Sequence, residues 1–114
     1  MLAVPNRLKK QKDFEAAFKN GRGFKDGFLF LKVAENGLTI SRFGFSVGLK
    51  VSKKATIRNK ARRRLREAIR LVISRIKTGF DVVVVPSPEV QDKNFKAIQD
   101  ALLKVLRKAG LLNR

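Results

Sequence analysis

The sequence contains no cysteine, histidine, tyrosine or tryptophan, and the first two absences each remove a class of chemistry. Without cysteine there is neither a disulfide framework nor a thiolate metal site. Without histidine, the usual general base near neutral pH and the most common transition-metal ligand are missing. Any catalysis by the protein itself would therefore depend on carboxylates or lysines.

Acidic residues are scarce as well. The chain has nine Asp and Glu among its 114 residues, and they are scattered along the sequence. A two-metal nuclease needs several carboxylates that converge on ions about 4 Å apart, and this spacing does not indicate such a site. We therefore expect no catalytic residue and no metal ligand in the chain, and a self-sufficient metal-dependent nuclease ranks third among the possible functions.

Long hydrophobic runs are also missing. No apolar stretch approaches the roughly 20 residues that span a bilayer, and the segment Met1–Lys12 lacks the apolar run of a signal peptide. We expect a cytoplasmic protein with no membrane partner. Hydrophobic residues still make up 44% of the chain, which is enough for a core, so residues 1–114 are expected to fold as one domain.

Positive charge is what the sequence has in excess. Lys and Arg number 27 against nine acids, which gives a formal net charge of +18. A chain of this composition repels itself unless a polyanion neutralises it. Nucleic acid is therefore the expected partner.

Three helices are expected where apolar residues recur at intervals of three and four. A glycine follows each of these segments, as is common after the last turn of a helix. The expected helices cover Asp13–Asn20, Ala55–Lys77 and Asp92–Ala109.

The expected strands are rich in aromatic and β-branched residues. Phe28–Ala34 and Leu38–Val47 are separated by an Asn36-Gly37 pair, which predicts a hairpin turn, and the second run is long enough for two strands. Phe80–Val85 lacks polar alternation and predicts a buried strand at the centre of the sheet. Together these elements predict an α+β sandwich, in which a four-stranded sheet packs with about three helices and the long helix lies between the last two strands.

The positive charge is concentrated in the long helix. Twelve basic residues and a single acid, Glu67, lie between Lys50 and Lys77. A charged helical face is usually only solvated, but this one has too few local acids to balance it. Arg side chains suit bidentate contact with phosphates, so we favour binding to a nucleic-acid backbone. On a helical projection, the cations opposite the apolar stripe are Arg62, Arg63, Arg66, Arg70 and Lys77, with Lys60 and Arg64 on its flank.

The segment Lys53–Arg70, KKATIRNKARRRLREAIR, resembles the signature of the bacterial ribonuclease P protein component. In that family an Arg-Asn-Arg core opens a basic helix. Asn6–Gly21 (NRLKKQKDFEAAFKNG) is similar to the family's first-helix motif, Gly44–Val47 (GFSV) to its third strand, and Phe80–Val85 to its last strand. The resemblance therefore covers most of the chain, with residues 89–114 supported mainly by the helix pattern.

Two features depart from the family pattern. The core triplet is Arg58-Asn59-Lys60, in which lysine keeps the charge of the expected arginine but loses its planar fork. Leu49 and Val51 also stand among the lysines expected in the connection between strand and helix.

The resemblance implies a protein subunit of ribonuclease P, which assists a catalytic RNA in the hydrolysis that removes the 5′ leader of precursor tRNA. Divalent ions such as Mg²⁺ would be held chiefly by the RNA. The implied partners are ribonuclease P RNA and the precursor tRNA leader, with no obligate protein partner. Arg58 projects toward the apolar side of a regular helix, and it would act from the first turn or contact RNA across the helix mouth. The residues implied to bind the catalytic RNA are Lys53, Lys54, Arg58, Asn59, Lys60, Arg62, Arg63, Arg66 and Arg70.

The resemblance also implies a cleft between the first helix and the sheet that receives the single-stranded leader. Phe14 and Phe18 lie one helical turn apart and could stack against a base. Aromatic pairs at this spacing are often core residues, so both alternatives stay open. Lys10, Lys12 and Arg42 are candidates for leader phosphate contacts, although each could equally be a solvated charge.

A structural RNA-binding protein, such as a ribosomal protein or an RNA chaperone, is the principal alternative. Its charge, size and helix pattern would look much the same, and only the motifs separate the two functions. A DNA-binding protein is less favoured because the sequence has no recognisable base-reading motif.

Overall fold

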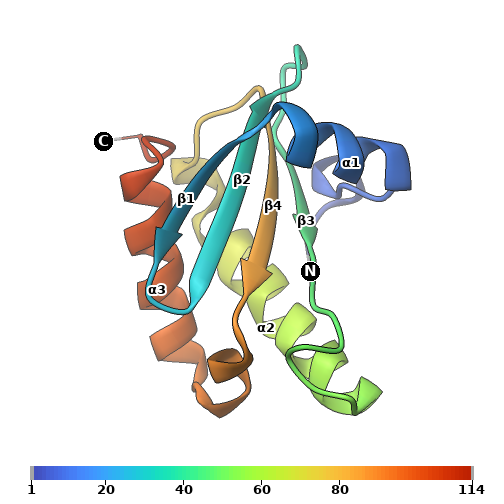
Figure 1. The fold of residues 1–114 in the computed structure, drawn as a ribbon. Coiled ribbons are helices and arrows are strands. Elements are labelled where there is room, and N and C mark those ends of the chain that lie inside the picture. The colour runs from blue at the N-terminus through green and yellow to red at the C-terminus, as the bar shows by residue number, and fades with distance from the viewer. Residues whose placement is uncertain (1, 114) are drawn as a thin grey trace.

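The computed structural model describes residues 2–113 and consists of a four-stranded sheet with helices on both faces (Figure 1). It confirms the expected α+β class, including the long basic helix between the last two strands. The main elements are α1 (Gln11–Asn20), β1 (Arg22–Asp26), β2 (Leu29–Glu35), β3 (Arg42–Phe45), α2 (Ala55–Val72), β4 (Phe80–Pro86) and α3 (Phe95–Lys108). Short 3-10 helices are η1 (Val4–Asn6), η2 (Ile73–Arg75) and η3 (Pro88–Asp92).

The strand order is β1-β2-β4-β3, so β4 lies inside the sheet as predicted. β2 pairs antiparallel with both β1 and β4, whereas β3 runs parallel to β4. The predicted hairpin across Asn36-Gly37 is wrong, because β4 separates β2 from β3. The hairpin instead joins β1 to β2, and Gly27 adopts a φ of 58° in its turn.

Local chemistry explains this difference. Asn36 Nδ2 donates to the carbonyl of Ile40 at 3.1 Å, and its Oδ1 accepts from the Leu38 N–H at 2.8 Å, so the side chain stabilises a longer loop. β1 was not predicted because this edge strand has only one large apolar residue, Phe24. A strand with so little hydrophobic alternation gives a weak signal in the sequence.

The largest differences from the predicted helix boundaries lie at the end of α2 and the start of α3. α2 ends at Val72 and continues as the 3-10 turn η2, so Lys77 lies beyond the helix. α3 begins after Asn94, whose side chain accepts a hydrogen bond from the Ala97 N–H at 2.9 Å and caps the first turn. No helix between residues 2 and 113 is both long enough and apolar enough to cross a membrane.

The main core lies between the sheet and the helices α2 and α3. Leu29, Leu31 and Val33 alternate along β2 and are buried on this face. The helices contribute the apolar stripes that periodicity predicts. Their buried residues are Ala61, Leu65, Ala68, Ile69 and Val72 from α2, and Ile98, Leu102, Val105 and Leu106 from α3.

The opposite face of the sheet is covered in part by α1. A small cluster forms there from Leu8, Ala17 and Val83, with Phe14 packed against it. A Cβ added to Gly44 would overlap the Phe14 ring and lie 3.2 Å from Leu8 Cβ. The glycine of the GFSV segment therefore provides the space in which the Phe14 ring packs on β3.

Gly44→Ala should lower the free energy of unfolding by about 1–3 kcal/mol, because its methyl group overpacks this cluster. Gly48→Ala is the matched control. Apart from the adjacent residues, no atom of the described residues lies within 4 Å of a Cβ added there. It should be neutral or stabilise by up to about 1 kcal/mol. Urea unfolding followed by far-UV circular dichroism measures both, as the chain has no tryptophan. Equal losses at the two positions would contradict this packing.

Candidate nucleic-acid interface

The cations of α2 surround the part of the helix that is not packed on the core. Five apolar residues on one side are buried. The outer side presents the exposed residues Asn59, Lys60, Arg63 and Arg70, while Arg58, Arg62, Arg64 and Arg66 are half-buried. Lys53 and Lys54 are exposed just before the helix begins. The structure therefore brings all nine predicted RNA-contacting residues onto one helix and the turn before it.

Two of these arginines bind the connection between β3 and α2. Arg58 Nη1 donates to the carbonyls of Ser52 and Lys53 at 3.0 and 2.9 Å. Arg62 Nη2 donates to the Val47 carbonyl at 3.0 Å. Because carbonyl groups are neutral, these bonds orient the guanidinium groups without cancelling their charge.

Acids neutralise very little of the charge on α2. Arg70 pairs with Glu67 through a hydrogen bond of 3.0 Å from Nε and a shorter one from Nη2. These hydrogen bonds raise the pKa of Arg70 and lower the pKa of Glu67. Within residues 2–113, no other cation of α2 forms an ion pair with a carboxylate. The surplus therefore remains available to a polyanion.

Arg64 and Lys77, which the helical projection placed beside or on the cationic face of α2, contact other parts of the chain. Arg64 Nη1 donates to the Lys93 carbonyl at 2.9 Å, so this side chain connects α2 to the segment before α3. The Lys77 N–H donates to the Leu111 carbonyl at 2.7 Å, beyond the end of α2. The projection placed Lys77 with the other cations only because it continued the helix by five residues.

A groove of about 480 Å³ lies between α1 and the end of β3. Phe14 and Phe18 line it from α1, and Phe45, Ser46 and Val47 line the other side. Phe18 is 40% exposed, whereas Phe14 is half-buried against Gly44. The two alternatives for this pair therefore separate: Phe14 contributes to packing and borders the groove, while the Phe18 ring is open to solvent.

The groove adjoins the cationic helix. Arg62 lines its edge. A smaller hollow of about 130 Å³ beside it is lined by Arg7, Phe14, Arg62 and Arg66, among others. The aromatic side chains of α1 and the arginines of α2 thus border one continuous surface.

The other predicted leader contacts divide into two kinds. Lys10 and Lys12 are exposed at the start of α1. Arg42 is half-buried, and two hydrogen bonds tie it to Asp81. These bonds raise the pKa of Arg42. Since carboxylates within the fold neutralise its charge, the structure offers no support for Arg42 as a phosphate ligand.

Sequence reasoning missed several residues that border the groove and the adjoining hollow. Phe45 lies on the same side of β3 as the fully buried Phe43, but it is only partly buried against the main core. Phe45 is the last residue of β3 and lies where the sheet opens toward the groove. Arg7 was missed because it precedes the first helix, and its neighbours in space come from β3 and α2.

The described residues also show what this interface lacks. Between residues 2 and 113, no three acidic side chains come together as a set of metal ligands.

Comparisons with known proteins show similarity over most of the chain. A family model described as Ribonuclease P matches residues 2–110. The ribonuclease P protein component of Clostridium botulinum strain 657 is 36% identical over 109 residues, which are 95% of this chain and 97% of that protein. The RNase P protein of Staphylococcus aureus has a TM-score of 0.86 at 29% identity, over 95% of this chain and 98% of the other. The RNase P protein from Thermotoga maritima has a TM-score of 0.82 at 33% identity, over 90% and 96%.

Proposed function

Because this chain belongs to the family of ribonuclease P protein components, we propose that it binds the catalytic RNA of ribonuclease P and the 5′ leader of precursor tRNA. Membership of this family makes it a subunit of ribonuclease P, an enzyme that processes tRNA. The finer proposal rests on one observation: two different kinds of surface adjoin in this structure. One is a helix with uncompensated cations, and the other is a groove bordered by an exposed aromatic ring.

The cationic side of α2 suits a folded RNA. Its guanidinium and ammonium groups match the phosphate backbone, and binding releases counterions from the RNA. Arg58 and Arg62 are already oriented by backbone carbonyls, so less conformational entropy is lost on binding. In this proposal α2 and its preceding turn bind ribonuclease P RNA through Lys53, Lys54, Arg58, Asn59, Lys60, Arg62, Arg63, Arg66 and Arg70.

The groove suits a single strand. An exposed ring such as Phe18 can stack on any base, so leaders of different sequence would be accepted. Lys10 and Lys12 lie at the start of the same helix and supply charge for leader phosphates. The proposed leader contacts are thus Phe14, Phe18, Lys10 and Lys12, without Arg42.

The protein then contributes binding rather than chemistry. The reaction is hydrolysis of one phosphodiester, and the catalytic RNA holds the Mg²⁺ ions that assist it. The protein reduces the repulsion between two RNAs and fixes the leader, which raises substrate affinity. We propose that the protein acts in the cytoplasm and has no obligate protein partner. Family membership favours this function over a ribosomal protein or RNA chaperone.

Neutralising two cations of α2, with Arg63→Gln and Arg66→Gln together, should weaken binding to ribonuclease P RNA roughly tenfold near 0.1 M salt. The plot of log affinity against log salt should become shallower by about 1.5, since each lost phosphate contact removes about 0.7–0.9 from the slope. Filter binding across a salt series measures both. The control pair Lys104→Gln and Arg107→Gln removes the same charge from exposed positions on α3. If both pairs changed the slope equally, binding would depend only on net charge.

Phe18→Ala should weaken holoenzyme binding to precursor tRNA by about 5- to 100-fold, because a base stacked on an aromatic ring contributes about 1–3 kcal/mol. Binding to mature tRNA, which has no leader, should not change. Leu38→Ala is the control, since Leu38 is 46% exposed and lies in the loop between β2 and β3, away from the groove lining. Equal losses for precursor and mature tRNA would refute the leader role of the groove.

A further inference from the structure

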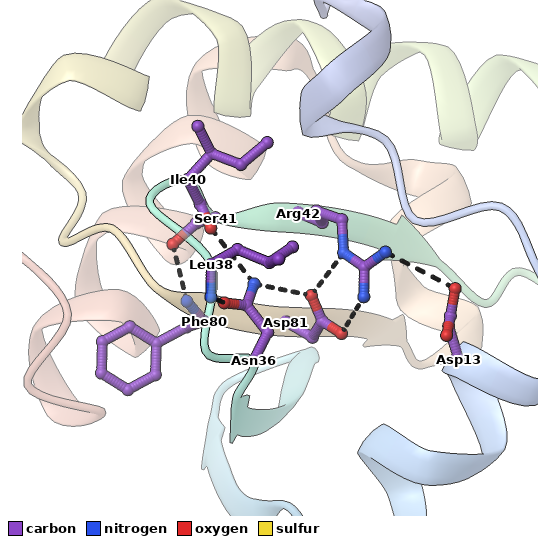
Figure 2. A network of polar contacts seen from close by, with 8 residues as sticks. All are labelled: Asp13, Asn36, Leu38, Ile40, Ser41, Arg42, Phe80 and Asp81. Atoms are coloured by element: carbon purple, nitrogen blue, oxygen red, sulfur yellow. Dashed lines mark hydrogen bonds and ion pairs between the residues drawn. The ribbon is translucent and has the colours of Figure 1, made fainter.

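Arg42 connects the sheet to α1 (Figure 2). Its Nε and Nη2 donate to the two carboxylate oxygens of Asp81 on β4 at 2.8 and 2.7 Å. Its Nη1 lies 3.5 Å from Oδ2 of Asp13, in the first turn of α1. The bidentate pair fixes the plane of the guanidinium group, and this plane directs the remaining nitrogen toward α1.

The sheet end of this connection is held firmly. Asp81 is 8% exposed and accepts a further hydrogen bond from Asn36 Nδ2 at 3.0 Å. Ser41, next to Arg42, donates to the Lys77 carbonyl at 2.7 Å and accepts from the Phe80 N–H at 3.1 Å. The strand that bears Arg42 is therefore bound to β4 by both backbone and side-chain contacts.

The other end of the connection, α1, is held much less firmly. Ala17 is its only buried residue among those described, and no side chain caps its N-terminus. On the helix, Asp13 and Phe14 lie on opposite sides of Ala17. Phe14 packs on Gly44 to one side, and Asp13 meets Arg42 to the other. Contacts on both sides of one buried residue restrain rotation of the helix about its axis.

We propose that Arg42 is a positioning residue for the leader groove. Through Asp13 it sets the rotation of α1 and hence the direction in which the Phe18 ring meets the groove. This inference rests on the proposed leader function of that groove. Arg42 itself then touches no RNA, and the residue that sequence reasoning assigned to leader phosphates acts through a protein contact.

The competing explanation makes the opposite prediction. If Asp13 were only a negative charge near RNA, its removal would reduce repulsion and tighten binding. If Asp13 positions the helix, its removal should weaken leader binding even though the protein becomes more positive. The sign of the effect therefore separates the two.

The test uses Asp13→Asn in the reconstituted holoenzyme. Replacing Arg42 would leave the buried Asp81 carboxylate without its cation, which threatens the fold. Asp13→Asn should weaken precursor tRNA binding by about 2- to 5-fold relative to mature tRNA, in line with a partly exposed ion pair of up to about 1 kcal/mol. Asp100→Asn is the matched control: it removes the same charge and a partly exposed ion pair with Lys96 from α3, outside the groove lining, and it should not weaken binding.

A double variant tests whether Asp13 affects leader binding through the Phe18 ring. In the Phe18→Ala background, Asp13→Asn should cause little further loss, because the ring that it positions is absent. Tighter binding by Asp13→Asn, or an undiminished loss in that background, would overturn the positioning role alone. If Phe18→Ala itself left the preference for precursor tRNA intact, the leader function of the groove would fail and the positioning role with it.

Discussion

Repulsion among the cations of α2 is the constraint on which the rest of the structure depends. The helix is held on the core by its buried apolar residues, while its outer side has almost no acids to balance the charge. Arg58 and Arg62 form hydrogen bonds to neutral carbonyl groups, which leave the repulsion among the cations largely in place. A free protein of this kind keeps an electrostatic cost that a polyanion removes on binding. The same residues thus account for the repulsion within the free protein and for the RNA binding that we propose.

The two faces of the sheet have different tasks. One face packs against α2 and α3 and forms the main core, which gives α2 a rigid base (Figure 1). The other face packs only a small cluster under α1, and this incomplete cover leaves a groove with an exposed Phe18. Arg62 and Arg66 border the hollow beside it. The surface that we propose for a folded RNA and the groove that we propose for a single strand therefore adjoin within one small fold.

Sequence reasoning succeeded where periodicity was strong and failed where distant segments meet. The stripe of α2 and the apolar run of β4 are long and regular, so both were predicted. The Asn36-Gly37 pair misled because local turn chemistry gives no sign that β4 inserts between β2 and β3. Arg42 looked like a free surface charge because its partner Asp81 is 39 residues away. The different exposure of Phe14 and Phe18 depends on how α1 lies on the sheet, where Phe14 packs on Gly44 and Asp13 pairs with Arg42.

The central claim is that this protein assists an RNA catalyst by binding and does not cut RNA itself. Cleavage of a leader-bearing precursor tRNA tests it most directly. The assay compares the protein alone, ribonuclease P RNA alone and the two together, at a Mg²⁺ concentration at which the RNA alone cleaves slowly. We predict no cleavage by the protein alone, and faster release of the mature 5′ end when both are present. Cleavage by the RNA-free protein, or an unchanged rate when it joins the RNA, would contradict the account.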